Sequence, residues 1–227
     1  MTVIAANLQA VRERIERAAH AAGRMPQTVK LLAVSKTFPA AAVRECHACG
    51  QQAFGENYLQ EALDKLLELA DLPLEWHFIG PIQSNKTRHI AENFDWVHGI
   101  EREKIAQRLN DVRSDKVAPL NVCIQVNVSG EASKAGVAPG EETALAAAIA
   151  RMPRLKLRGL MTIPEPTADV TLQRRRYALL RALKTSLEAQ GHMLDTLSMG
   201  MSDDLESAVT EGATLVRVGA AIFGRRS

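Results

Sequence analysis

The sequence predicts an α/β protein, a single (β/α)8 TIM barrel that spans residues 1–227 as one domain. Eight short apolar segments alternate with segments of helical periodicity, which indicates a parallel sheet, and eight strands are the number that closes a barrel. The chain length of 227 residues is close to the roughly 250 residues typical of such barrels. No linker rich in proline, glycine or serine divides the chain, and it contains no internal repeat.

The predicted strands are short apolar runs, as expected for a parallel sheet that is buried on both faces. They cover residues 30–35, 53–56, 76–79, 96–98, 122–128, 157–163, 196–199 and 215–219. The run 122–128 is the clearest of them. An open doubly wound sheet is the alternative, but the glycine fingerprint of a dinucleotide site does not follow the first strand.

The predicted helices carry apolar residues three and four positions apart, and several of them end at a glycine. They cover residues 7–22, 39–49, 58–70, 84–92, 101–113, 140–151, 169–190 and 202–211. In the helix 58–70, the face expected to be buried is marked by Leu59, Leu63, Leu66 and Leu67. Because few residues follow the last strand, we expect the helix 7–22 to occupy the place of a missing final helix.

The composition indicates an ordinary globular domain, with 46% hydrophobic and 24% charged residues. A net charge of +2 gives no field that would favour nucleic acid or a membrane surface as a partner. The first residues resemble no secretory signal, and no apolar stretch is long enough to cross a bilayer. Three cysteines do not form a disulfide framework, so we expect a cytoplasmic protein, and we expect it to be a monomer.

Lys36 is the first candidate for chemistry, because it directly follows the buried strand 30–35. Barrel enzymes place their reactive groups at the carboxyl ends of the strands, and Pro39 suits the first turn of the next helix. A lysine amine can form a Schiff base with an aldehyde, above all that of pyridoxal 5′-phosphate (PLP). A solvated lysine at a strand end is the alternative interpretation.

The loop after the seventh predicted strand has the features of a phosphate site. Ser198 and Ser202 supply hydroxyl donors, Gly200 lets a ligand approach the backbone, and a helix begins directly afterwards. Barrels often bind phosphate with the loops after strands seven and eight. Ser202 can alternatively serve only as a helix cap, and Asp203 and Asp204 should point away from a bound anion.

The eighth predicted strand places Arg217 and Gly219 on one face, because they are two residues apart. A buried arginine needs a partner, which is either a carboxylate or the pyridine nitrogen of PLP. Asn57, His77 and Met161 stand in other predicted strands or directly after them. Together they can line a binding site for the ring.

These residues belong to segments that carry a family resemblance over nearly the whole chain. The segments are Leu32 to Thr37, Phe54 to Tyr58, Trp76 to Gly80, Gln83 to Lys86, Asn127 with Glu131, Lys134 and Gly136, Arg158 to Met161, Ser198 to Asp204, and Val216 to Gly219. In them the chain resembles the PLP homeostasis protein family, whose fold is similar to the barrel domain of alanine racemase, fold-type III among PLP proteins. No site position departs from the family pattern.

The resemblance implies that Lys36 holds PLP as a Schiff base and that Arg217 faces the pyridine nitrogen. It also implies phosphate contacts from the loops after strands seven and eight. The implied cofactor-binding residues are Lys36, Asn57, His77, Met161, Ser198, Gly200, Met201, Ser202, Arg217, Gly219 and Ala220. We expect no catalytic residue and no metal ligand among them.

An arginine at the pyridine nitrogen limits the chemistry of PLP, because a guanidinium donates hydrogen bonds but cannot hold a proton on that nitrogen. PLP is then a weak electron sink. Racemases with such an arginine use the lysine and a tyrosine from a second domain as two bases. The present sequence ends soon after Gly219 and contains only Tyr58 and Tyr177, so we expect no second domain and no such base.

We therefore expect a PLP carrier that acts in PLP homeostasis and amino-acid balance without turnover, with PLP-dependent acceptor enzymes as candidate partners. A small single-domain amino-acid racemase is the alternative. A phosphate-binding barrel without PLP, which would be colourless, is a third interpretation. Lys86 and Lys134 are further amines that can meet PLP, or they are merely solvated.

Overall fold

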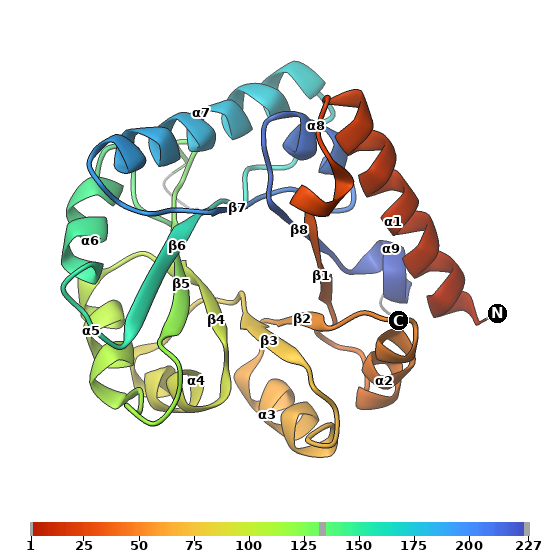
Figure 1. Cartoon of the computed structure of the whole chain (residues 1–227), viewed down its shortest axis with the longest axis horizontal. Coiled ribbons are helices and arrows are strands. Elements are labelled where there is room, and N and C mark those ends of the chain that lie inside the picture. The colour runs from red at the N-terminus through yellow and green to blue at the C-terminus, as the bar shows by residue number, and fades with distance from the viewer. Residues whose placement is uncertain (1, 132–134, 225–227) are drawn as a thin grey trace.

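The computed structural model describes residues 2–131 and 135–224 of the chain. Eight parallel strands close into a barrel in the order β1 to β8, and helices surround the barrel on its outside (Figure 1). The last strand, β8, pairs with β1 and so completes the ring. The predicted fold class is confirmed, and the open doubly wound sheet is excluded.

The strands lie where the apolar runs predict them, with small shifts. They are β1 Lys30–Val34, β2 Ala53–Glu56, β3 Glu75–Phe78, β4 Trp96–Ile100, β5 Leu120–Gln125, β6 Leu155–Met161, β7 Thr196–Ser198 and β8 Leu215–Val218. Both β5 and β6 begin and end earlier than predicted, because Leu120 pairs with Leu155 at their start. Beyond β5, Val126 forms an isolated bridge with Val137 and the chain leaves the barrel.

The helices also follow the prediction. They are α1 Val3–Ala21, α2 Ala40–Ala48, α3 Leu59–Glu68, α4 Thr87–Asn93, α5 Glu103–Val112, α6 Glu142–Ile149, α7 Val170–Ala189, α8 Leu205–Thr210 and α9 Ala220–Phe223, with 3₁₀ turns at Pro26–Thr28 and Ser84–Lys86. The short helix α9 was not expected from the sequence. Across residues 2–131 and 135–224, none of the helices has the length and apolar character that crossing a bilayer requires.

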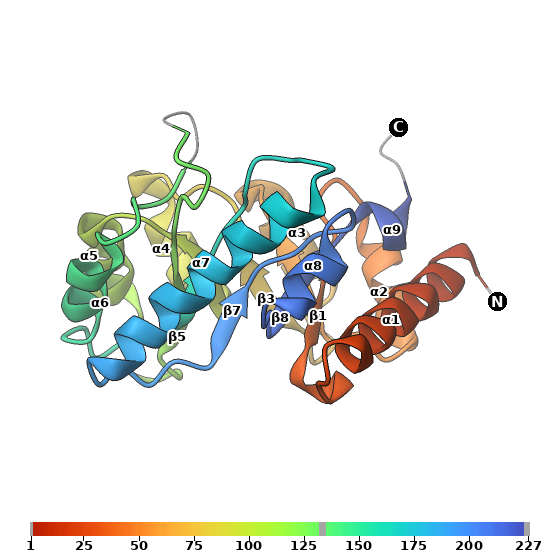
Figure 2. The same ribbon diagram turned by 90° about the horizontal axis from the view of Figure 1, so that it is seen from above.

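Helix α1 packs beside α8 and α9, at the point where the ring of helices closes (Figures 1 and 2). The Arg14 guanidinium forms an ion pair with Glu206 at 2.9 Å and donates to the Ser202 carbonyl at 3.0 Å. The Asn7 side chain donates to the Ile222 carbonyl at 3.0 Å. The expectation that the first helix takes the place of a final helix is therefore confirmed.

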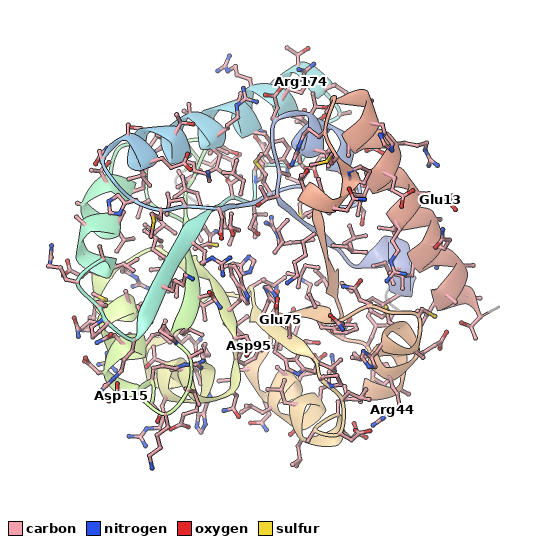
Figure 3. The ribbon with its side chains drawn as sticks, in the orientation of Figure 1. Glu13, Arg44, Glu75, Asp95, Asp115 and Arg174 are labelled. Carbon is pink, nitrogen blue, oxygen red and sulfur yellow. The ribbon has the colours of Figure 1, made fainter. Side chains whose placement is uncertain are left out.

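The inside of the barrel holds both apolar and polar side chains. One apolar cluster consists of Leu32, Val34, Ala53, Ile79 and Leu215, and a second consists of Trp96, Cys123 and Met161. Figure 3 shows Glu75 and Asp95 near the middle of the ring, whereas Glu13, Arg44, Asp115 and Arg174 lie on its outside. The larger core lies between the outer face of the barrel and the helices.

Helix α3 departs from the prediction at Leu67, whereas Leu59 and Leu66 pack against the core as expected. Leu67, expected on the buried face, is 82% exposed, whereas Ala62 and Lys65 are buried. Lys65 forms ion pairs with Glu56 and Glu61, so the side of α3 that carries Lys65 also faces the barrel.

Candidate functional site

Lys36 lies just beyond the end of β1, at the carboxyl end of the barrel, and is partly buried. Leu32 and Val34, at alternate positions of β1, point into the barrel. Lys36 stands two residues after Val34, in the turn that leaves the strand. Its backbone therefore lies at the carboxyl end of the barrel, as the sequence predicts.

The backbone on both sides of Lys36 is held by a group of polar residues that we call the Lys65 cluster: Ser35, Thr37, Glu56, Glu61 and Lys65. Lys65 Nζ donates to the Ser35 carbonyl at 2.7 Å, to Glu56 Oε1 at 2.8 Å and to Glu61 Oε1 at 2.6 Å. The Ser35 hydroxyl donates to Glu56 Oε1 and the Thr37 N–H donates to Glu61 Oε1, both at 2.6 Å. These contacts tie the segment around Lys36 to β2 and α3.

Two members of this cluster are in states that are unfavourable in free energy, and their contacts with the other members offset this. Glu56 is fully buried, and burial raises its pKa although the Lys65 ammonium opposes the shift. Thr37 has φ of 70°, a left-handed conformation that costs a non-glycine residue about 1–3 kcal/mol. Because Glu61 binds the Thr37 N–H, α3 holds this turn in place directly after Lys36.

Arg217 lies in β8, beside Leu32 of β1, and is only 3% exposed. Its Nη1 donates to the Ser198 hydroxyl at 2.7 Å and its Nη2 donates to the Thr162 carbonyl at 2.7 Å. The sequence left open whether a carboxylate pairs with this arginine. Both acceptors among the described residues are neutral, so the positive charge of Arg217 is not neutralised by a bonded carboxylate.

The loops after β7 and β8 approach the ends of the strands closely at two glycines. Gly200 has φ of +91°, and a Cβ there would lie 2.5 Å from the Ala208 Cβ. A Cβ on Gly219 would lie 3.0 Å from the Val34 carbonyl oxygen. A side chain at position 200 is therefore excluded, and one at position 219 would have to displace Val34 of β1.

Asp204 holds the β7 loop in shape. Its carboxylate accepts the Met201 N–H at 2.6 Å and the Tyr177 hydroxyl at 2.7 Å. Tyr177 is fully buried beneath this loop. Burial raises the pKa of Tyr177 and the neighbouring Asp204 raises it further, so its hydroxyl stays protonated and acts as a donor.

Asn57 directly follows β2, the strand that pairs with β1. Its side-chain oxygen is buried and has no hydrogen-bond partner among the described residues. An acceptor left in this state is costly unless a ligand satisfies it. A neighbouring groove of about 580 Å³ is lined by Asn57, Tyr58, Leu59, Gln60, Phe78, Pro81, Gln83 and Lys86. Lys134 lies outside the described residues.

His77 and Met161 lie deeper than the mouth. Both nitrogens of the His77 ring are engaged, one by Glu75 and the other by His98 at 2.9 Å, and the ring stacks on Trp96. Met161 is fully buried. Contact of either residue with a cofactor, like the phosphate contacts of Ser198, Met201, Ser202 and Ala220, stays a prediction.

Four residues of this region were missed by the sequence analysis: Glu56, Lys65, His98 and Thr162. His98 could have been predicted to lie on the same face of the sheet as His77, because it alternates with Trp96 in β4 just as His77 alternates with Glu75 in β3. Lys65 carried a weaker one, since it stands four residues after Glu61 on a helix. Among the described residues, no group of three metal-ligating side chains converges.

The residues at the mouth fit a phosphate-bearing aldehyde cofactor. Lys36 supplies an amine, Arg217 a buried cation whose bonded partners are neutral, and Asn57 an unsatisfied acceptor. Fold and site together define a class of barrel proteins related to alanine racemase. The sequence profile of the family described as alanine racemase, N-terminal domain, matches residues 6–227.

Curated relatives narrow this class. A pyridoxal phosphate homeostasis protein of Pseudomonas aeruginosa is 64% identical over 226 residues, which cover 100% of this chain and 97% of the relative. A protein of the same name from Escherichia coli K12 is 51% identical and covers 100% and 98% of the two chains. The chain belongs to the pyridoxal phosphate homeostasis protein family, which confirms the resemblance seen in the sequence.

Solved structures agree with this assignment. PipY of Synechococcus elongatus, determined with PLP bound, is 37% identical with a TM-score of 0.85, and the alignment covers 97% of this chain and 100% of PipY. Alanine racemase of Corynebacterium glutamicum is 21% identical with a TM-score of 0.70, and the alignment covers 99% of this chain and 61% of the racemase. The second similarity shows a shared fold only.

Replacing Gly200 with alanine should destabilise the chain and weaken PLP binding. The left-handed backbone costs about 1–3 kcal/mol for a residue with a side chain, and the contact with Ala208 adds to this. Gly191→Ala is the matched control, because Gly191 has a similar φ of +94° but open space around it. Denaturant unfolding and PLP titration of both variants measure the effect; equal PLP affinity in the two variants would contradict a role of Gly200 at the cofactor.

Proposed function

We propose that this chain binds PLP at the carboxyl end of its barrel through Lys36 and serves PLP homeostasis and amino-acid balance in the cytoplasm without turning over a substrate. The observation that carries the proposal is the placement of Lys36. Its neighbours on both sides are pinned by the Lys65 cluster, and its strand is paired with the strand of Arg217. The names of the relatives and the PLP-bound structure of PipY support it.

Each residue then has a defined task. When bound, PLP supplies an aldehyde, which a lysine amine takes as a Schiff base with loss of one water. Arg217 donates a hydrogen bond toward the pyridine nitrogen and, being permanently protonated, leaves that nitrogen without a proton. Asn57 offers the acceptor that is unsatisfied in its buried position. The loops at Gly200 and Gly219 would bind the phosphate through their backbone N–H groups.

The two tyrosines are the candidates for the second base that a racemase would need. Tyr177 donates its hydroxyl to Asp204 and has a raised pKa, so it is unsuited to remove a proton from a substrate. Tyr58 is 52% exposed and lines the groove beside Asn57. A racemase that uses Lys36 together with Tyr58 or a base from solvent is the second candidate, and the shared fold with alanine racemase is the observation that favours it.

Incubation of the PLP-loaded chain with L-alanine and other L-amino acids separates the two candidates. We expect D-enantiomers to form no faster than with free PLP at the same concentration, because the Tyr177 hydroxyl stays protonated and bonded to Asp204, and Tyr58 is half-exposed. Chiral chromatography over several hours measures the product. Sustained turnover above that of free PLP, lost in the variant Tyr58→Phe, would establish that the chain is a racemase. A protein that stays colourless after exposure to PLP would instead indicate a phosphate-binding barrel that does not hold PLP.

The partners we propose are PLP and, where the cofactor is passed on, PLP-dependent acceptor enzymes. Recovery of activity by a cofactor-free enzyme mixed with the PLP-loaded chain tests such delivery. We further propose that the chain acts as a monomer, which light scattering of the loaded chain tests.

A further inference from the structure

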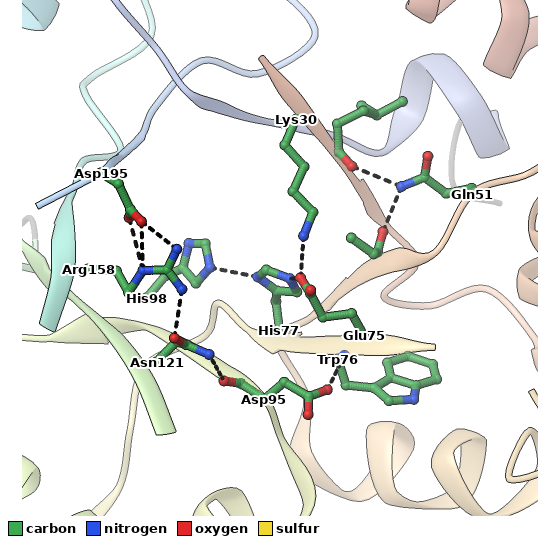
Figure 4. A network of polar contacts seen from close by, with 12 residues as sticks. Lys30, Gln51, Glu75, Trp76, His77, Asp95, His98, Asn121, Arg158 and Asp195 are labelled. Carbon is green, nitrogen blue, oxygen red and sulfur yellow. Dashed lines mark hydrogen bonds and ion pairs between the residues drawn. The ribbon is translucent and has the colours of Figure 1, made fainter. Parts of the chain in front are cut away.

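A row of hydrogen-bonded side chains crosses the inside of the barrel, and we call it the interior relay: Glu75, His77, His98, Ser198 and Arg217. The relay begins with Glu75, which lines a hollow of about 420 Å³ at the amino-terminal end of the barrel. It ends at the carboxyl mouth with Arg217. Figure 4 shows its first part, in which Lys30, Glu75, His77 and His98 follow one another.

Every link of the interior relay is a direct contact. The Glu75 carboxylate contacts His77 Nε2 and also accepts from the Lys30 ammonium. His77 Nδ1 lies 2.9 Å from His98 Nε2, and His98 Nδ1 lies 2.8 Å from the Ser198 hydroxyl oxygen. Arg217 Nη1 donates to the same oxygen at 2.7 Å. The two histidines and the serine are fully buried, so water does not compete for these bonds.

The protonation of the end groups gives the relay one direction. Burial lowers the pKa of His77 and lowers that of His98 further, so both rings are neutral near pH 7 and each has a single N–H. Burial alone would raise the pKa of Glu75, but His77 and Lys30 outweigh it and lower that pKa to about 2. The Glu75 carboxylate therefore only accepts hydrogen bonds, at any pH near neutrality.

The positions of the protons follow one from another. His77 must carry its proton on Nε2 to meet the Glu75 carboxylate, which leaves Nδ1 as an acceptor. His98 must then carry its proton on Nε2, and its Nδ1 accepts from the Ser198 hydroxyl. The Ser198 oxygen is left with its lone pairs turned toward Arg217. Every proton in the row points toward the amino-terminal end of the barrel.

We propose that Glu75 is a positioning residue for Arg217, because its carboxylate fixes the tautomers of His77 and His98 and thereby directs the Ser198 hydroxyl proton to His98 Nδ1, which keeps the Ser198 lone pairs turned toward the arginine. Arg217 is otherwise anchored by the Thr162 carbonyl, on its second amino group. The Ser198 contact thus sets the orientation of the guanidinium. The inference rests on the proposed function, in which Arg217 meets the pyridine nitrogen of PLP.

The variant Glu75→Gln tests this proposal with little change in shape. A glutamine can accept from Lys30 with its oxygen and donate to His77 Nε2 with its amide, so the relay can reverse and both histidines move their proton to Nδ1. Asp95→Asn is the matched control. Asp95 lines the same hollow, but its carboxylate accepts the Trp76 N–H at 2.8 Å and is not part of the relay.

Nitrogen NMR of histidine in the PLP-free chain reads these tautomers directly. With ¹⁵N-labelled histidine at pH 7, we expect Nε2–H forms for His77 and His98 in the wild type and in Asp95→Asn, and Nδ1–H forms in Glu75→Gln. A charged ring or an Nδ1–H form in the wild type overturns the proposal. Unchanged tautomers in Glu75→Gln overturn it as well.

PLP titration of the same variants measures how the relay affects the affinity for PLP. We expect Glu75→Gln to weaken PLP binding about fivefold, the worth of one neutral hydrogen bond, and Asp95→Asn to leave the affinity unchanged. His98→Asn places an amide where Nδ1 stood, so it keeps the Ser198 contact but does not reach His77. In that background Glu75→Gln should have no further effect.

Independent effects of Glu75→Gln and His98→Asn on PLP affinity would show that Glu75 does not act through His98. Absence of PLP binding in all forms, the wild type included, overturns the proposed function. The tautomers are measured without PLP, so they decide the direction of the relay in either case.

Discussion

Replacing Lys36 with alanine is expected to reduce covalently held PLP to background. The variant has no amine at the end of β1, so the visible absorbance of the protein-bound cofactor should vanish after gel filtration. Reduction of the wild type with borohydride should add the mass of the reduced cofactor to the peptide that contains residue 36. Lys36→Arg retains the positive charge but cannot condense with the aldehyde, so it separates covalent binding from attraction between charges.

Lys86→Ala is the control for this experiment, because Lys86 lines the groove beside Asn57 but lies outside β1. Its absorbance and reduced peptide should match those of the wild type. An unchanged spectrum in Lys36→Ala would move the Schiff base to another lysine and would overturn the assignment of Lys36.

Replacing Lys65 with methionine should lower the free energy of unfolding by about 3–5 kcal/mol, which is typical when one partner of a buried ion pair is removed. Glu56 is fully buried and would be left without its cation. The variant also loses the donor that binds the Ser35 carbonyl, so PLP binding through Lys36 should weaken. Denaturant unfolding measures the first effect and PLP titration the second.

Adding Glu56→Gln to Lys65→Met should restore most of the lost stability, because no uncompensated charge then remains in the interior. Arg44→Met is the control from the surface, where Arg44 pairs with Asp71 in an exposed position, and its unfolding midpoint should stay close to that of the wild type. If Lys65→Met unfolds at the same midpoint as Arg44→Met, the Lys65 cluster is not the support of β1 that the contacts suggest.

The barrel could be predicted from the sequence because its strands are short apolar runs separated by amphipathic helices, and that periodicity is local. Lys36 and Arg217 could be placed at the mouth because the carboxyl ends of parallel strands share one edge. The prediction for α3 failed at Leu67, since the burial of Lys65 depends on Glu56, nine residues away and in a different element.

The interior relay could not be read from the sequence for a similar reason. His77 and His98 each look ordinary in their own strands, and the contact between them depends on the register of β3 against β4. Ser198 was predicted to contact a phosphate, and its bonds to His98 and Arg217 inside the barrel could not be foreseen from the sequence. Only the closed ring brings these residues together from four separate strands, β3, β4, β7 and β8.

The packing of α1 has a consequence for the order of events during folding. Asn7 reaches Ile222 across 215 residues, and Arg14 reaches Glu206 across 192. Contacts between such distant residues slow folding, because a long loop must close before they can form. Leu32 likewise meets Arg217 only when β8 is in place. A nascent chain therefore carries the lysine long before the arginine, and the strands of the two residues are paired only when β8 closes the ring.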